Sequence, residues 1–171
     1  MYNFDTFDSF IMSTNGQTIG TGECWDYINL IWVHLGSIYY TYPPSDPTAT
    51  NHGVKWGVLN NAALLTNQIS GLTYISDKTF LKRGDIVVST DGDFGHAGFI
   101  NSDYDGEHNY DLYTQNYNNR RSVALDTYDL HDFGGAFRVN AWNTTPPEPY
   151  STRTHFKWVL YARKLRDKRG M

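Results

Sequence analysis

The sequence lacks the features that mark several classes of protein. One cysteine stands among 171 residues, so no disulfide can form within the chain. No apolar run approaches the roughly 18–20 residues of a membrane-spanning helix, and the acidic start, residues 1–8, lacks the basic segment of a secretory signal peptide. Hydrophobic residues make up 40% and charged residues 19%, which excludes disordered and fibrous chains. A single domain with a packed core remains.

Aromatic residues, by contrast, are abundant, at 16% of the chain. This is more than an ordinary core needs, so some of the rings are expected to line a groove. Plain packing in a β-rich domain would also use them.

Charge is unevenly distributed along the chain. Residues 1–150 carry 7 basic and 17 acidic residues (net −10), and residues 151–171 carry 7 and 1 (net +6), which together give −4. A basic end can bind an anionic polymer, such as nucleic acid or a teichoic-acid-rich wall, or dock on its own acidic domain. Alternating apolar residues over 156–165 favour a strand packed on the domain, and the acidic bulk argues against a nucleic-acid partner.

Hydrophobic periodicity predicts helices in the first half of the chain. Residues 1–21 show little apolar periodicity. Residues 23–35 repeat apolar side chains at spacings of three and four, which predicts a helix that ends at Gly36. Three prolines over residues 42–47 require a loop, and a shorter helix is expected over residues 54–65.

After Gly71 the pattern becomes that of an antiparallel sheet. The expected strands are residues 86–89 and 97–101, joined by a turn-rich hairpin, and residues 110–117, 135–142 and 156–165. Helices followed by such a sheet predict an α+β domain. We assign it to residues 1–142. A Pro-containing linker and a basic C-terminal strand, residues 143–171, are expected to pack on the same domain.

Cys24 stands where the helix of residues 23–35 begins. Free backbone N–H groups and the positive end of the helix dipole favour a thiolate there. The same N–H groups can hold an oxyanion when a carbonyl is attacked. The alternative is a buried structural cysteine, the common fate of a lone cysteine.

His96 and Asn116 are the candidate partners of Cys24. His96 follows a Gly-rich turn and begins a strand, so its ring is expected at the end of the sheet, where it can take the proton of a thiol. Strand alternation puts Thr114 and Asn116 on one face, from which the Asn116 amide can orient the imidazole. A structural histidine and a polar strand end at residues 115–116 remain alternatives.

Five segments carry these residues in a specific order. They are Gly-Glu-Cys-Trp-Asp-Tyr at 22–27, Leu-Lys-Arg-Gly-Asp-Ile-Val-Val at 81–88, Gly-His-Ala-Gly-Phe-Ile at 95–100, Thr-Gln-Asn-Tyr at 114–117 and Gly-Gly-Ala-Phe-Arg at 134–138. Their order and spacing resemble those of the CHAP family, the cysteine, histidine-dependent amidohydrolases/peptidases. The resemblance runs from about residue 15 to residue 139, with a weaker match at residues 53–56.

The resemblance implies a papain-like fold of the CHAP and NlpC/P60 kind, in which helices carrying Cys24 pack on an antiparallel sheet carrying His96 and Asn116. It implies Cys24 as nucleophile, His96 as general base and then acid, and Asn116 as the residue that orients the imidazole.

The sequence departs from the family pattern at two positions. Thr114 occupies the position of a frequent acidic residue, so the imidazolium either lacks a carboxylate partner or borrows one from elsewhere. Glu23 stands where Gln is usual, which puts a carboxylate beside the oxyanion position unless its side chain points away. Together with Gln115, these residues are candidate supporting residues.

Some family members bind calcium just before the cysteine. The corresponding positions here are Asn15, Gln17 and Thr21, with Asp26 as the main carboxylate. Calcium sites use several oxygen ligands and more charge than this. We therefore expect no metal and no cofactor, with Asn15, Gln17 and Asp26 as weak calcium candidates.

The implied function is cysteine-dependent hydrolysis of amide or peptide bonds in bacterial peptidoglycan, by an endopeptidase or N-acetylmuramoyl-L-alanine amidase. The chain is then expected to be a bacteriophage lysin released from the host cytoplasm at lysis, or a hydrolase on the virion tail with other tail proteins as partners. The expected substrate is the cell wall, with neither nucleic acid nor a membrane span involved.

Three alternatives stay open. The NlpC/P60 peptidases use the same chemistry, but their Asp-Cys-Ser-Gly motif is absent. A non-catalytic phage tail or wall-binding component on a degenerate hydrolase scaffold fits the departures at Thr114 and Glu23. A metal-dependent hydrolase would use Asp91, Asp93 and His96, although a hairpin turn also explains these residues.

Overall fold

The computed structural model describes residues 1–35, 66–67, 69–106 and 109–143. The predicted loop over 42–47, the helix over 54–65 and the strand over 156–165 lie outside the described residues. The linker and basic end that we assign to residues 143–171 lie there almost entirely, so the domain division stays a prediction. Within the described residues, no helix combines the length and apolar character that crossing a membrane requires.

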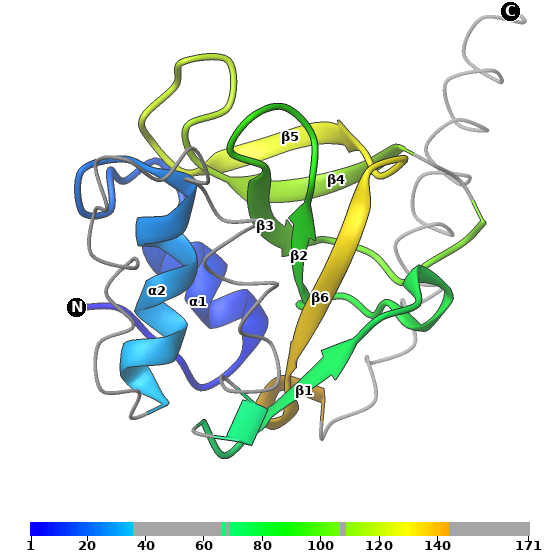
Figure 1. Ribbon diagram of the computed structural model, residues 1–171. Helices are drawn as coiled ribbons and strands as arrows, with labels where there is room; N and C mark the ends of the chain where they lie inside the picture. Colours follow the sequence, from blue (N-terminus) through cyan, green and yellow to red (C-terminus); the bar gives the residue numbers. More distant parts are fainter. Residues whose placement is uncertain (36–65, 68, 107–108, 144–171) are drawn as a thin grey trace, which may run out of the picture.

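The described part of the chain is an α+β structure, as predicted. Its helices and strands are α1 Phe7–Thr14, α2 Cys24–His34, β1 Leu72–Ile75, η2 Lys78–Phe80, β2 Ile86–Ser89, β3 His96–Ile100, β4 Asn109–Thr114, β5 Ala124–Asp129, β6 Phe133–Val139 and η3 Asn140–Asn143. The strands form one antiparallel sheet in the order β1-β6-β2-β3-β4-β5. Both α-helices lie on one side of this sheet (Figure 1).

Helix α1 lies within residues 1–21, where the sequence shows little apolar periodicity and no helix was named. Thr6 caps the helix by accepting a hydrogen bond from Ser9 N at 3.1 Å. The helix buries four side chains at helical spacing, namely Phe7, Phe10, Ile11 and Thr14. The pattern was present but short, and the polar residues between these positions concealed it.

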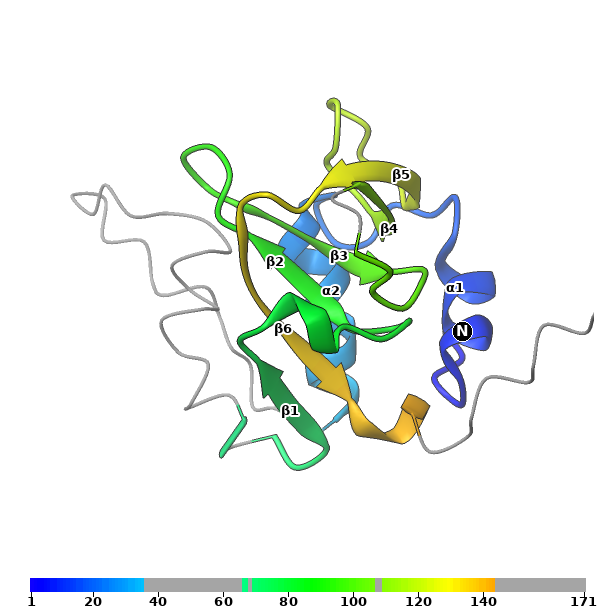
Figure 2. The same ribbon diagram turned by 90° about the vertical axis from the view of Figure 1, so that its right-hand side faces the viewer.

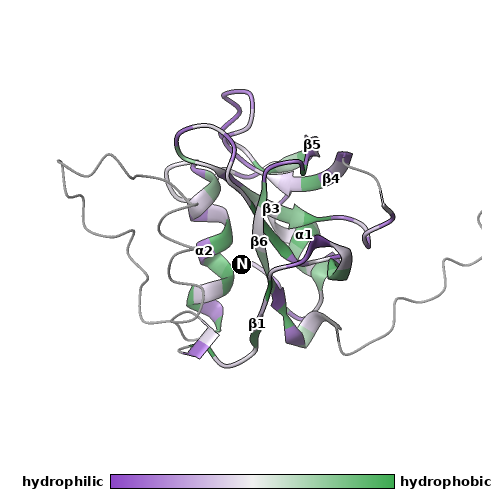
Figure 3. Ribbon diagram, turned by 45° about the vertical axis from the view of Figure 1, so that its right-hand side comes forward, coloured by the Kyte–Doolittle hydropathy of each residue, from purple (hydrophilic) through white to green (hydrophobic). Residues whose placement is uncertain are grey.

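The predicted helix over residues 23–35 is confirmed as α2. It buries Tyr27, Ile28 and Trp32 against the sheet, in a core that includes Phe99 of β3. The Tyr27 ring stacks on Phe10 of α1 with centroids 5.5 Å apart, so the two helices share one aromatic core. The side of α2 that faces the sheet is hydrophobic, and the outer side is mixed (Figure 3).

Strands β2 and β3 are buried along their whole length. Val88 and Phe99 face the core under the helices, while Val87 and Ile100 belong to a second apolar cluster on the opposite face. Tyr128 of β5 joins that second cluster. Strands β3 and β4 lie between β2 and β5, so the sheet must curl to bring Val87 of β2 and Tyr128 of β5 into one cluster. The twist of the sheet is evident in Figure 2.

Two strand ends differ from the prediction in ways that affect the pocket. β3 begins at His96, one residue earlier than expected, and β4 ends at Thr114 instead of continuing to residue 117. β5, which was not among the expected strands, pairs with β4 along its whole length. Its sequence, Ala-Leu-Asp-Thr-Tyr-Asp, is too polar to predict a strand. Its pairing with β4 at the edge of the sheet decides its conformation.

A buried ion pair joins the start of β2 to β6. The Asp85 side chain is fully buried and accepts hydrogen bonds from Arg138 Nε at 3.0 Å and Arg138 Nη2 at 2.8 Å, and from Lys82 N at 2.7 Å. Burial raises the pKa of Asp85, an effect that Arg138 partly offsets. The Gly-Asp-Ile segment of the sequence thus has a structural role here.

Replacing Arg138 by Met should lower the free energy of unfolding by about 3 kcal/mol, because the buried Asp85 carboxylate loses its cation. Urea unfolding followed by circular dichroism measures the change. Lys82→Gln is the control, since the Lys82–Asp103 pair is about half exposed and such pairs contribute at most about 1 kcal/mol. A similarly small loss for Arg138→Met would contradict the structural role.

Candidate active site

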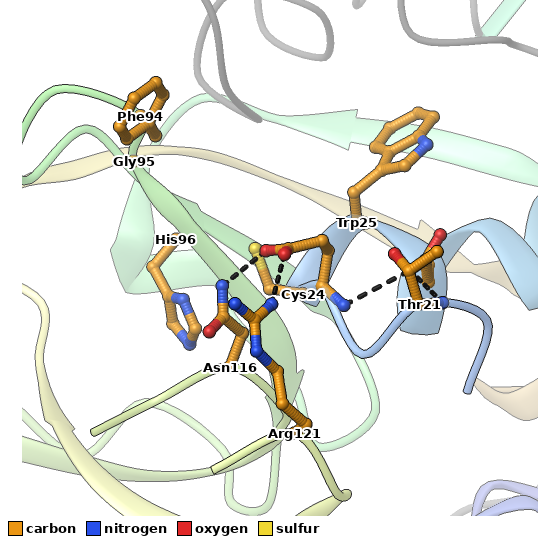
Figure 4. A pocket seen from close by; sticks show the side chains of 10 residues that line it. Thr21, Cys24, Trp25, Phe94, Gly95, His96, Asn116 and Arg121 are labelled. Carbon is orange, nitrogen blue, oxygen red and sulfur yellow. Dashed lines mark hydrogen bonds and ion pairs between the residues drawn. The ribbon is translucent and has the colours of Figure 1, made fainter. Parts of the chain in front are cut away.

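A pocket of about 580 Å³ opens between the start of α2 and the start of β3 (Figure 4). The residues that line it are Thr21, Glu23, Cys24, Trp25, Asp26, Phe94, Gly95, His96, Asn116 and Arg121. The structure therefore brings Cys24, His96 and Asn116 together from three separate parts of the chain.

Cys24 is the first residue of α2 and is buried. Burial raises the pKa of its thiol to about 11. Backbone N–H groups of Ala97, Trp25 and Cys24 itself favour the thiolate, while the charge of Glu23 opposes it. The N–H groups at the helix start thus favour the thiolate, as expected, but desolvation outweighs them and the pKa of the thiol stays raised.

His96 is 9% exposed at the start of β3. Its ring stacks on Tyr128 with centroids 5.2 Å apart and lies 5.6 Å from the ring of Tyr117. Burial lowers the pKa of His96 to about 4, although the negative charges of Asp126 and Asp91 act in the opposite direction. The imidazole is neutral at neutral pH and can accept a proton.

Thr114, the last residue of β4, holds the imidazole. Its Oγ1 lies 2.7 Å from His96 Nε2 and 2.7 Å from Ala97 O, with Gln115 O at 3.3 Å. A hydroxyl has one proton, and a carbonyl oxygen can only accept, so the Thr114 proton goes to a carbonyl and Oγ1 accepts from Nε2–H. This assigns the Nε2–H tautomer and leaves Nδ1 as the unprotonated nitrogen.

Gly98 allows Thr114 to come this close to β3. A Cβ at Gly98 would lie 2.9 Å from Tyr113 O and 3.0 Å from Thr114 Cβ. Any larger residue would push β4 away from β3 and lengthen the contact with His96. This close approach explains the second glycine of the Gly-His-Ala-Gly-Phe-Ile segment.

Asn116 lines the pocket but does not share a strand face with Thr114, so that expectation is wrong. β4 has already ended, and Asn116 has a left-handed backbone with φ +59°. Alternation holds only while the chain is extended. The Asn116 amide donates to Glu23 Oε2, and the described residues show no hydrogen bond between Asn116 and His96.

Gln115 anchors the loop that precedes Cys24. Its buried amide accepts from Ile19 N at 3.1 Å and donates to Ile19 O at 2.9 Å and to Glu23 O at 2.6 Å. The loop and the end of β4 are therefore tied together through one side chain. Sequence reasoning noted Gln115 as a supporting residue but not this contact.

Asp26 organises the same loop from inside α2. Its Oδ2 accepts from Thr21 N at 2.8 Å, from Thr21 Oγ1 at 2.7 Å and from Glu23 N at 3.2 Å. The carboxylate thus accepts from the backbone N–H groups of two residues that lead into α2, as the N3 side chain of a capping box does for the N-cap. This fixes the direction in which the chain enters Cys24.

The calcium candidates form no ligand cluster in the described part of the chain. Asn15 and Gln17 are exposed, and the Asp26 carboxylate is engaged with the loop. Among the described residues, no three His, Cys, Asp or Glu side chains are placed to hold a metal ion, and this includes Asp91 and Asp93. Independence from metals stays a prediction.

Sequence reasoning missed three features of this pocket. Trp25 and Phe94 border it on the side above Cys24 (Figure 4), and Phe94 is 58% exposed at the tip of the β2–β3 hairpin. Arg121 reaches into it from the loop after β4. Arg120 and Arg121 form one of two adjacent basic pairs in the acidic body, the other being Lys82 and Arg83, and this signal could have pointed to the loop.

Comparison with solved structures identifies a similar fold. The crystal structure of Ly7917 matches with a TM-score of 0.50 and 17% identity, over 76% of this chain and 60% of that chain. Ly7917 with the hydrolyzing product of MDP matches at 0.48 and 13%, over 72% and 56%. A wild type endolysin, LysIME-EF1, matches at 0.37 and 14%, over 65% and 63%. The chain thus spans less than two thirds of the length of each. No family model and no curated protein matches the sequence.

Alkylation of Cys24 should report its protonation state. With a thiol pKa of about 11, the iodoacetamide rate constant should rise about tenfold per pH unit between about pH 7 and pH 10, because only the thiolate reacts. Mass spectrometry of quenched samples measures the rate. A constant rate across that range would instead indicate a thiolate–imidazolium pair. The same protein in denaturant is the control, and its rate should level off near the pKa of an ordinary thiol.

Proposed function

We propose that this protein is a cysteine-dependent hydrolase of amide bonds in bacterial cell-wall peptidoglycan, on a papain-like scaffold of the CHAP kind. The observation that carries the proposal is the pairing in one pocket of a thiol at a helix start, Cys24, with a neutral imidazole, His96, whose Nδ1 is free to accept a proton. The ordered motifs of residues 22–138 support it, and the fold similarity to Ly7917 agrees with the scaffold.

In this mechanism, Cys24 Sγ attacks the carbonyl carbon while His96 Nδ1 takes the thiol proton. Backbone N–H groups at the start of α2 stabilise the oxyanion. The C–N bond breaks as the imidazolium returns its proton to the leaving amine, and a thioester remains. Water then attacks the thioester with His96 as base, which releases the carboxylate product and the free thiol.

Thr114 takes the place of the acidic residue that the family often has. A hydroxyl orients the ring through Nε2–H but brings no charge, so it stabilises the imidazolium less than a carboxylate would. Asp126 and Asp91 supply a negative field at His96 that opposes the lowering of its pKa, although burial outweighs it. We propose that Asn116 holds the Glu23 carboxylate and that Thr114 orients the imidazole.

A second candidate is a non-catalytic phage tail or wall-binding component on the same scaffold. The Glu23 charge beside a thiol whose pKa is already raised favours this non-catalytic candidate.

The proposed enzyme would act at the cell wall as a lysin or as a virion tail hydrolase. Mass spectrometry of fragments from purified peptidoglycan would separate amidase from endopeptidase, because each leaves different new termini.

Loss of the thiol should abolish hydrolysis. Cys24→Ala and Cys24→Ser should each show no decrease in the turbidity of purified cell walls, with the circular dichroism spectrum and melting temperature unchanged. Iodoacetamide should inactivate the wild type through its one cysteine. Full activity in Cys24→Ala would refute the cysteine mechanism, and inactive wild-type protein on every wall type would favour the non-catalytic candidate.

The two candidate orienting residues can be separated by substitution. Thr114→Val removes the hydroxyl at nearly constant volume and should lower kcat by about tenfold to a thousandfold with little change in KM. Thr114→Ser should restore most of the rate. Asn116→Ala should cost less than Thr114→Val, because its amide contacts Glu23 and not the ring.

Imidazole 15N chemical shifts give a readout beyond activity. The wild type and Thr114→Ser should show the Nε2–H tautomer of His96, and Thr114→Val should show a mixture. The assignment to Thr114 is wrong if Asn116→Ala alone alters the tautomer and the rate.

A further inference from the structure

Arg121 is placed at the rim of the pocket by a close contact with the loop before Cys24. A Cβ at Gly22 would lie 2.8 Å from Arg121 Cβ and 3.1 Å from Arg121 Cδ, and Gly22 has φ +90°. Both facts require glycine at this position. The stem of Arg121 therefore lies against the chain that leads into α2, and its guanidinium extends beside Asn116 near Cys24 (Figure 4).

The guanidinium is fixed in direction but not saturated. Its Nη1 donates to Glu23 Oε1, and the side chain is 51% exposed. Arginine has five N–H donors in a planar fork. Arg121 lines the pocket, and among the described residues no hydrogen bond uses its Nε or Nη2, the two donors that together suit a carboxylate.

The carboxylates of the lining are both engaged in hydrogen bonds. Glu23 accepts from Arg121 and Asn116, and Asp26 accepts from Thr21 and from the Glu23 backbone. Arg121 is the one arginine or lysine among the described residues that line the pocket. Arg121 therefore offers a ligand two spare donors, Nε and Nη2, on a charged group, which suits an anionic group on the substrate.

We infer that Arg121 binds a carboxylate of the substrate close to the bond that Cys24 attacks. This inference rests on the proposed function and narrows its substrate class to acidic peptides. In a peptidoglycan stem, the carboxylate would be the free α-carboxylate of a γ-linked glutamate or the C-terminal carboxylate of the stem. The Glu23 contact holds the guanidinium in place, so little side-chain freedom is lost when the carboxylate binds.

The test compares matched soluble stem peptides that differ in one group. In the first pair, one peptide carries isoglutamate and the other carries isoglutamine. In the second pair, one peptide ends in a carboxylate and the other ends in an amide. Wild-type kcat/KM should be about tenfold higher or more for the carboxylate member of one pair, as expected for a hydrogen bond to a charged group. The pair that responds identifies the carboxylate. Equal rates within both pairs would overturn the inference.

Arg121→Gln should reduce that ratio to about one, and Arg121→Lys should keep part of it, since an ammonium lacks the planar fork. The ratio cancels general damage to the site, because such damage slows both members of a pair. Lys82→Gln, which removes a positive charge outside the pocket, should leave the ratio unchanged. An Arg121→Gln ratio equal to that of the wild type would assign the preference to another residue and refute the inference.

Binding separates this inference from the proposed function. Calorimetry of the same peptides with Cys24→Ala protein requires no turnover. Tighter binding of the carboxylate member by Cys24→Ala protein, lost in Cys24→Ala/Arg121→Gln, would support the subsite. Failure of the wild type to hydrolyse either peptide would then count against the proposed function but not against the subsite. Equal binding of the carboxylate and amide members within both pairs would refute the subsite.

Discussion

The pocket depends on the end of β4, where three consecutive side chains each hold a different part of it. Thr114 accepts from the imidazole of His96, Gln115 ties the loop before Cys24 to the strand, and Asn116 donates to Glu23. A strand could not do this alone, because alternation would send the middle side chain away from its neighbours. The strand ends at Thr114 and the backbone is left-handed at Asn116, so Thr114 reaches the start of β3 while Gln115 and Asn116 reach the loop before α2.

Burial decides the resting charges of the site. The pKa of Cys24 rises from 9.0 to about 11, which corresponds to about 3 kcal/mol in favour of the thiol. A helix dipole contributes typically less than about 1 kcal/mol in the opposite direction. The same burial holds His96 neutral. Both groups therefore meet a substrate uncharged, and the first step of the proposed reaction is a proton transfer that accompanies attack.

The glycines and the acidic residues of the motifs act mainly on geometry. Gly98 lets β4 approach β3, Gly22 lets Arg121 approach the loop, and Asp26 compensates the N–H groups before α2. Asp85 anchors β2 to β6 through Arg138. These glycines and carboxylates therefore shape and support the pocket. The proposed chemistry is left to few side chains, chiefly Cys24 and His96.

The sequence alone determined the features that depend on residues close together in the chain, namely where helices and strands begin. The period of residues 23–35 placed Cys24 at a helix start, and the Gly-rich turn before His96 placed that residue at a strand start, so the α+β order followed. Tertiary structure alone decided that Thr114 and not Asn116 contacts the imidazole, that Arg121 enters the pocket, and that burial keeps the thiol protonated. These features arise from contacts between segments far apart in the chain and from exclusion of water, which no local pattern encodes.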